Sequence, residues 1–491
     1  MRAFLLATLL LAGCTGAAEA ERVLDRRGFP TDGAGAGLAP PPSCEAPDCW
    51  SASTGEFAMD LSADGAGGVT YMAWEGGGWD IEHTGGNTFV GAPAALMHFD
   101  AAGALNQTLG FDSHISPHDF DHTGDGGLVV ALGDQVALQG VPLTGAGSVF
   151  KLDANWEVQW QVHSPSGGQP ARFGVVGMPD GGALVLARTH KAVLDDEGNE
   201  LLPQTDAQPN TQHGIARLGA DGELIWAHRT HPLGEAAVGT DGSVVFSLEI
   251  GFGMDAPLWD GSSLPLDLGD AQEGRFVVRV DPAGDLMWVL PIGSHVTADG
   301  LQVAPTSDGG AWITPAWYRP FGANAADLTV YVGEASSTLP STDPYAQHAA
   351  IVRLDGDGAV VSWEWPWAEV GLQEYLVGEI EDIATDVDDG LLVSGKLMAF
   401  SIPFNDLIPF DAGLTTLAGS AVGQSGDYLA RVEPDGRGGW GLGHAIGNEY
   451  RVSHLATDGT HAFLDYVGPD WDGAPAGPGG PLVRIPLPPI E

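Results

Sequence analysis

The chain has 491 residues, and 65 Asp and Glu against 19 Lys and Arg give it a formal net charge of −46. A negative field of this size repels phosphate backbones and argues against nucleic acid as a partner. The 72 Gly, 34 Pro and 44% hydrophobic residues argue against disorder and favour an all-β fold rich in turns. The acidic surface is expected to serve solubility, with cation binding at Asp-rich turns as the alternative.

The start of the chain predicts export from the cytoplasm. An apolar run from Ala3 to Ala12 is too short to span a bilayer and is typical of the core of a signal peptide. The sequence LAGC, which ends at Cys14, resembles the lipobox of bacterial lipoproteins. That resemblance implies a signal peptide over residues 1–13, cleavage before Cys14, and acyl chains on Cys14 that anchor the protein to a membrane. An ordinary secretory signal cut after Ala18 or Ala20 is the alternative.

The segment after the lipobox predicts a tether. Thr15 stands where lipoproteins retained in the inner membrane have Asp, so the resemblance implies the outer membrane, with the side that the protein faces left open. Residues 14–43 are rich in Gly, Ala and Pro without a period, as in flexible linkers. With Cys14 set aside, Cys44 and Cys49 form an even pair in an oxidising compartment, and we expect a disulfide between them.

Two phrases alternate along residues 44–491, which we expect to form one domain. The first is an Asp-Gly turn followed by a β-rich run, as in TDGSVVFSLE; its turn aspartates are Asp64, Asp125, Asp180, Asp241, Asp308, Asp389 and Asp458. The second is a hairpin such as FVVRVDPAGDLMWVL (276–290), with an apolar run on each side of an Asp-x-x-Gly turn. Each phrase occurs seven times, but the last hairpin, PLVRIPLPP, lacks its second arm.

This alternation predicts a seven-bladed β-propeller of four-stranded antiparallel blades. A solenoid of the same units is the rival fold, but it would need caps at both ends. The truncated last hairpin needs a partner strand, since an unpaired outer edge invites aggregation. DCWSAST, at residues 48–54, contains Trp50, which matches the tryptophans in the second arms of other copies. We therefore expect this N-terminal segment to close the last blade.

The two phrases resemble, in a divergent form, the β-propeller repeat of bacterial secreted and surface lipoproteins over about residues 50–489. That family has no common activity, so the resemblance implies a fold and a cellular location but no function. The sequence contains no Gly-x-Ser-x-Gly, His-Glu-x-x-His or phosphate-binding loop, and no catalytic residue is predicted. We expect a monomeric, non-catalytic binding or scaffold module for a protein or glycan partner. A metal-dependent hydrolase or lyase at the mouth of the propeller channel is the alternative.

Histidines supply the candidate metal site. After the fourth strand of several units the chain carries His114, His163, His231, His295 and His444. The connections from one blade to the next meet around the channel mouth of a propeller, where converging imidazoles can hold a divalent transition metal or an anion. Solvated loop side chains are the alternative, and no cofactor is otherwise indicated. The stretch from Asp121 resembles the start of a calcium loop, but Leu132 stands in place of the bidentate Glu, which favours a polar connection between blades.

Overall fold

Every regular element that the structure describes is a β-strand. The computed structural model describes residues 50–53, 57–74, 81–82, 88–89, 94–111, 117–133, 147–165, 171–203, 212–230, 233–250, 257–258, 262–263, 274–294, 297–318, 328–339, 347–364, 376–399, 415–416, 425–436, 438–446, 452–466 and 481–487. Within these ranges no helix has the length and apolarity needed to cross a membrane. The predicted signal peptide, Cys14, the tether and the pair Cys44 and Cys49 lie outside the described residues.

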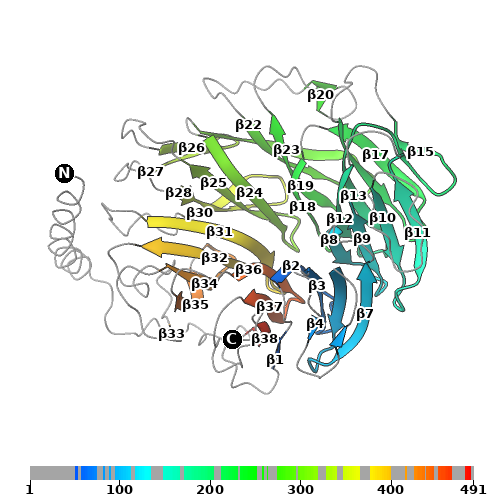
Figure 1. Ribbon diagram of the computed structural model, residues 1–491. Coiled ribbons are helices and arrows are strands. Elements are labelled where there is room, and N and C mark those ends of the chain that lie inside the picture. The colour runs from blue at the N-terminus through cyan, green and yellow to red at the C-terminus, as the bar shows by residue number, and fades with distance from the viewer. Residues whose placement is uncertain are drawn as a thin grey trace, which may run out of the picture.

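Seven antiparallel sheets, here called blades, follow one another along the chain (Figure 1). Blade 1 comprises β2 (Phe57–Ala63), β3 (Val69–Trp74), β6 (Ala94–Phe99) and β7 (Leu105–Phe111). Blade 2 comprises β8 (Pro117–His122), β9 (Leu128–Leu132), β10 (Ser148–Leu152) and β11 (Val158–His163). Blade 3 comprises β12 (Arg172–Gly177), β13 (Ala183–Thr189), β16 (Gln212–Leu218) and β17 (Leu224–Thr230). Blade 4 comprises β18 (Leu233–Val238), β19 (Val244–Ile250), β22 (Gly274–Val280) and β23 (Leu286–Ser294).

The last three blades repeat the same order of strands. Blade 5 comprises β24 (Thr297–Pro305), β25 (Ala311–Tyr318), β29 (Ile351–Leu354) and β30 (Val360–Glu364), and β28 (Gln347–Ala349) also pairs with β25. Blade 6 comprises β31 (Leu376–Thr385), β32 (Leu391–Ala399), β34 (Ser425–Val432) and β35 (Gly438–Ile446). Blade 7 comprises β36 (Val452–Thr457), β37 (His461–Tyr466), β38 (Pro481–Pro486) and β1 (Trp50–Ser53). The predicted seven-bladed β-propeller is confirmed.

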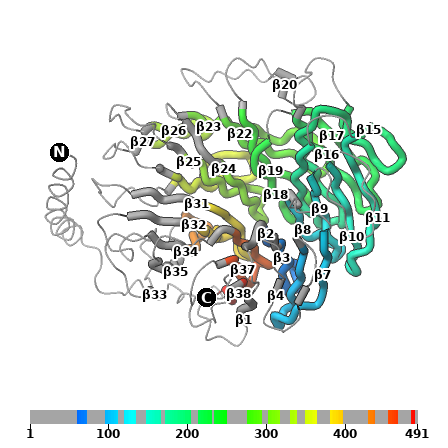
Figure 2. Tube along the Cα trace, in the orientation of Figure 1, coloured from blue at the N-terminus to red at the C-terminus, as the bar shows by residue number. Residues whose placement is uncertain are grey.

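The two ends of the described chain close the ring. β1 pairs antiparallel with β38, which places Trp50 opposite Arg484. The same register sets Trp160 opposite Lys151 in blade 2 and Trp288 opposite Arg279 in blade 4. The innermost strands β36 and β2 are also in contact, so the last blade lies beside the first (Figure 2). The prediction that the N-terminal segment supplies the missing outer strand is confirmed.

Short strands from the loops between second and third strands extend some of the blades. β14 (Val193–Leu194) and β15 (Glu200–Leu202) leave blade 3 and continue the sheet of blade 2. β26 (Leu328–Val332) and β27 (Ala335–Leu339) leave blade 5 and continue the sheet of blade 4 in the same way. β33 (Thr415–Thr416) pairs with β35, and two small hairpins are formed by β4 (Ile81–Glu82) with β5 (Thr88–Phe89) and β20 (Pro257–Leu258) with β21 (Ser262–Ser263).

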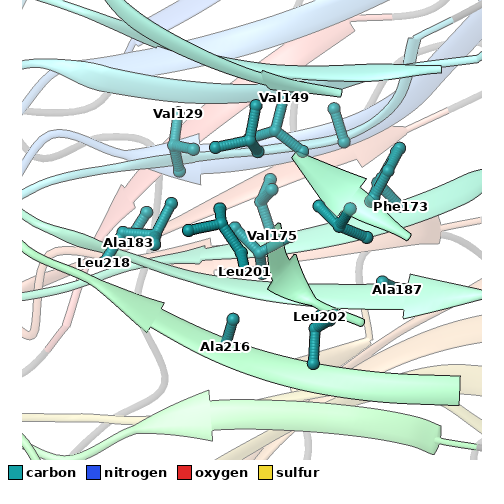
Figure 3. Packing of buried hydrophobic residues seen from close by; sticks show 14 of the residues in the cluster. Val129, Val149, Phe173, Val175, Ala183, Ala187, Leu201, Leu202, Ala216 and Leu218 are labelled. Atoms are coloured by element: carbon teal, nitrogen blue, oxygen red, sulfur yellow. The ribbon is translucent and has the colours of Figure 1, made fainter. Parts of the chain in front are cut away.

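The core lies between neighbouring blades. The middle strands are apolar on both faces, as in LVVAL of β9, where every side chain is buried. One cluster joins Val129 and Val149 of blade 2 to Phe173, Val175 and Leu218 of blade 3 (Figure 3). Another joins blade 1 to blade 7 across the closing junction. Each four-stranded sheet therefore covers its two faces with its neighbours, which is why a single unit would not be stable alone.

A basic residue on the third strand explains the recurring Arg of the hairpin phrase. In six blades it pairs with a carboxylate of the first turn: His98 with Asp64 (3.4 Å), Lys151 with Asp125 (2.7 Å), Arg217 with Asp180, Arg279 with Asp241 (3.1 Å), Arg353 with Asp308 (2.7 Å) and Arg431 with Asp386. In blade 7 Arg484 contacts His461, which lies 3.0 Å from Asp458. The repeat pattern in the sequence predicts Asp389 as the turn aspartate of blade 6. That assignment is wrong, because Asp389 takes the left-handed position (φ 64°) that glycine takes in other turns.

The same hairpin phrase also joins each blade to the next. Trp226 in β17 donates its indole N–H to the carbonyl oxygen of Pro282 in the hairpin turn of blade 4, at 3.2 Å. Arg217 donates to the same carbonyl oxygen. Trp160 and Trp288 make equivalent bonds to Ala220 and Gly356. The Arg, the turn and the Trp recur together because they form one inter-blade contact.

Candidate functional site

The innermost strands of all seven blades line a central channel of about 830 Å³. These strands contribute residues 60–63, 119–121, 172–177, 233–238, 303–305, 382–385 and 455–457 to the lining, and residues 186–188, 213 and 249 of other strands complete it. A propeller channel is a common place for ligands, because loops and side chains of every blade converge there. Carboxylates are prominent in it: Asp60, Asp119, Asp121, Glu235 and Asp382 all line the channel.

These carboxylates follow a register. The third residue before the end of the innermost strand is, in blade order, Asp60, Asp119, Gly174, Glu235, Gln302, Asp382 and His454; we call these seven positions the channel ring. Five of them line the main channel, and Gln302 lines an adjoining cavity of about 270 Å³ together with Glu235. A β-bulge precedes the position in blades 1, 2, 6 and 7, just before Asp60, Asp119, Asp382 and His454.

Members of the channel ring join neighbouring blades. Asp119 accepts a hydrogen bond of 2.8 Å from the backbone N–H of Val175 in blade 3. Asp382 accepts one of 2.9 Å from the N–H of Leu455 in blade 7. Gln302 donates from its amide to the carbonyl oxygen of Glu381 in blade 6. One register position thus forms bridges between three different pairs of blades.

Asp121, two residues after the channel ring in blade 2, makes the same kind of bridge in both directions. It accepts hydrogen bonds from the hydroxyl of Ser62 in blade 1 (2.5 Å) and from the N–H of Gly177 in blade 3 (2.8 Å). Asp125 pairs instead with Lys151 at 2.7 Å. The two carboxylates of the calcium-like motif therefore have separate partners, and the polar connection between blades is the reading that this geometry favours.

Burial governs the ionisation of the channel carboxyls. Burial raises the pKa of Asp119 to about 7 and that of Asp382 to about 7. Burial, followed by the charge and hydrogen bond of Asp119, raises the pKa of Asp60 well above its usual range. Asp60 and Asp119 share a hydrogen bond between blades 1 and 2, so one proton held by the pair avoids two adjacent negative charges. Burial also raises the pKa of Glu235.

The one histidine of the channel ring, His454, has a pKa that changes in the opposite direction. Burial lowers the pKa of His454, the blade 7 member of the channel ring, to about 4. The channel ring therefore combines carboxyls that retain protons near neutral pH with an imidazole that stays neutral. Such groups can donate and accept hydrogen bonds, and carboxyls with a pKa near 7 can exchange protons at neutral pH.

The predicted metal site remains a prediction. His163 is the last residue of β11, and His444 lies in β35. His114, His231 and His295 lie outside the described residues, so their distances to one another are not defined. Among the residues that the structure does describe, no group of three or more His, Cys, Asp or Glu is arranged to hold a metal ion.

The channel ring is the feature that the sequence analysis missed. Its signal is an acidic residue four positions before the first residue of the turn, as in Asp60 before Asp64 and Asp382 before Asp386. This position lies upstream of both repeated phrases, which begin at or after the turn.

The comparisons with known proteins find similarity to solved structures alone. No protein-family model and no curated protein matches the chain. Among solved structures, it is similar to a protein of unknown function from Bacteroides caccae (TM-score 0.34, 11% identity, 76% of this chain and 93% of that one). It is also similar to YCF48 bound to a D1 peptide (0.37, 10%, 92% and 100%) and to the WD40 domain of SCAP from fission yeast (0.37, 7%, 89% and 97%).

Proposed function

We propose that this chain is a lipid-anchored protein of the bacterial cell envelope whose propeller binds a partner protein without catalysing a reaction. The observation that supports this most is the use of the channel carboxylates. Asp119, Asp121 and Asp382 accept backbone hydrogen bonds from the neighbouring blade, so they hold the ring together. A rigid ring of this kind is a scaffold for surface recognition. Anchoring through Cys14 and membership of the β-propeller-repeat lipoproteins belong to the same proposal.

Cross-linking on intact cells of the native host tests this function. The expected result is a complex of the anchored chain with one envelope protein, formed equally by the wild type and by Asp119→Asn, with the reverse cross-link recovered from the partner. Cross-linking to a glycan alone, or no complex at all, would contradict the proposal. Thermal melting of both variants controls for folding.

A metal-dependent hydrolase or lyase at the channel is the second candidate. The pKa values of about 7 for Asp119 and Asp382 favour it, because both groups can transfer protons at neutral pH. The histidines His163 and His444, with the three others predicted, would supply metal ligands. Elemental analysis of the purified mature protein separates the candidates: stoichiometric zinc, copper or iron, lost on His163→Ala with His444→Ala, would favour the enzyme.

A further inference from the structure

Exposed apolar side chains gather at one place in the repeat. The large hydrophobic residues that are well exposed in the described ranges are Leu224, Ile225, Leu286, Met287, Tyr331, Val361 and Val387. Five of them lie at the start of the fourth strand in the three consecutive blades 3, 4 and 5. We call Leu224, Ile225, Leu286, Met287 and Val361 the outer strip; their exposed fractions run from 40% to 57%.

The outer strip occupies a defined register. In each of these blades the pairing of the third and fourth strands shifts by one residue, and the bulged residue is Ile225, Met287 or Val361. The same bulge in blades 1, 2 and 6 falls on Asn106, Gln159 and Gly439. The fold therefore accepts polar residues or glycine at this position. Apolar residues in three adjacent blades are not needed for packing, and exposed apolar groups of this kind mark interaction surfaces.

The edge beside the outer strip is charged. Exposed carboxylates flank it in all three blades: Asp221 and Glu223, Asp285, and Asp357. Arg217, Arg279 and Arg353 of the same hairpins are buried, with exposed fractions of 7%, 3% and 6%. Arg229 and Arg275 are partly buried and lie at the ends of β17 and β22 that are farther from the hairpin turns, and Arg275 pairs with Glu249. The strip thus presents apolar side chains beside exposed carboxylates, while the arginines nearest to it in these hairpins, Arg217, Arg279 and Arg353, are buried.

Charge selects the kind of partner. A second copy of this chain carries the same net charge of −46, so bringing two strips together would add repulsion to the cost of association. A basic partner gains both apolar burial and electrostatic attraction, which speeds its encounter and favours it over acidic competitors. We propose that the outer strip binds a partner protein whose contact surface carries Lys or Arg around apolar side chains. This inference rests on the proposed binding function and names its surface.

The chain itself supplies the test substitutions. In Ile225→Gln/Met287→Gln/Val361→Asn the bulges receive the residue types that blades 1 and 2 already carry, and the net charge is unchanged. The control variant is Tyr331→Gln/Val387→Gln, which removes two exposed apolar residues outside the strip. The probe is a fluorescent peptide of alternating Lys and Val, and binding is followed by anisotropy at increasing sodium chloride.

The triple variant is expected to bind roughly tenfold or more weakly, since three apolar contacts are lost. The control variant should bind as the wild type does, and salt should weaken binding to both. Equal binding by the triple variant and the wild type would overturn the inference. So would equally tight binding of an alternating Glu and Val peptide, strip-dependent binding of a neutral glucan, or a wild-type dimer that the triple variant does not form.

Failure of the inference and failure of the proposed function give different results. Strip-dependent peptide binding without an envelope complex in cells supports the surface and contradicts the function. An envelope complex that forms equally with the triple variant supports the function and overturns the outer strip as its site.

Discussion

Arg484, in the third strand of the last blade, donates a hydrogen bond of 2.8 Å to the carbonyl oxygen of Ala101 in the hairpin turn of the first blade. This is the contact that Arg217 and Arg353 make between consecutive blades, to Pro282 and Pro434. The closing junction therefore uses the same chemistry as the internal ones. Six of the 19 basic residues of this acidic chain stand at this repeat position, where each is buried.

Replacing Arg484 should weaken the closing junction. In Arg484→Gln the carbonyl of Ala101 and the neighbouring His461 lose a buried charged donor, and we expect the free energy of unfolding to fall by about 2 kcal/mol. Urea unfolding followed by tryptophan fluorescence measures this. Arg188→Gln is the matched control, because it removes the same charge from an exposed position. An equal loss in both variants would show that the junction contact is not the cause.

The closing strand gives a second prediction. Deleting residues 15–43 should leave the melting temperature unchanged, because the deletion ends before β1. Extending the deletion through Thr54 removes β1 and its pairing with β38, and exposes a sheet edge. We expect aggregation or failed secretion, since a typical domain has only ~5–15 kcal/mol of net stability. Cys44→Ser/Cys49→Ser separates loss of the predicted disulfide from loss of the strand. Equal melting of both deletions would contradict the role of β1.

The hairpin glycines provide a matched pair of substitutions. A Cβ at Gly284 would lie 2.6 Å from Cγ of Trp226, whereas a Cβ at Gly198 would meet no atom within 4 Å. Both glycines have a positive φ, 87° and 85°, so Ala strains the backbone at both by roughly 1–2 kcal/mol. Gly284→Ala should lose a further ~1–3 kcal/mol from overpacking against the tryptophan. Similar losses in the two variants would mean that the indole moves away at little cost.

The membrane anchor is tested by metabolic labelling. Radiolabelled palmitate should enter the wild type and Cys44→Ser but not Cys14→Ser, because the lipobox cysteine accepts the acyl chains. Label in all three proteins, or in none, would remove the lipoprotein assignment and leave an ordinary secretion signal.

The sequence predicted the blades because their determinants are local. An Asp-Gly turn, an Arg and a Trp lie within one hairpin, and each copy carries the same spacing. Even the closing strand was predictable, because Trp50 keeps the register of Trp160 opposite a basic residue. The local signal also explains the error at Asp389, since a run of acidic residues at 386–389 offers three candidates for one turn position.

The channel ring could be identified only from the structure. Asp60 and Asp119 are 59 residues apart, and their contact depends on how two blades face each other around the axis. The spacing of the repeats along the chain does not reveal how two neighbouring blades are oriented around the axis. The predicted histidines lie in or near the connections between blades, which differ in length. Their distance in sequence from the fourth strand therefore does not determine where they lie in space.

The shared proton of Asp60 and Asp119 makes a pH dependence the most specific prediction for the channel. Burial holds the pKa of Asp119 at about 7, above the ordinary carboxyl value, so the folded chain keeps a proton that the unfolded chain releases. This stabilisation is complete below the ordinary carboxyl pKa and is lost as the pH rises through about 7. Asn at position 119 keeps an oxygen for the N–H of Val175 and does not ionise. The melting temperature of the wild type should therefore fall relative to that of Asp119→Asn as the pH rises.

Melting curves of the two proteins from about pH 5 to about pH 8 measure this shift. We expect the difference in their free energies of unfolding to change by on the order of 2 kcal/mol over this range, since channel solvent screens part of the effect. Asp221→Asn removes an exposed carboxyl of blade 3 and controls for the loss of one negative charge. A gap between the wild type and Asp119→Asn that stays constant over this range would mean that Asp119 is ionised throughout. In that case the proton of the pair at the junction of blades 1 and 2 stays on Asp60, and Asp119 acts as an acceptor for both Asp60 and Val175.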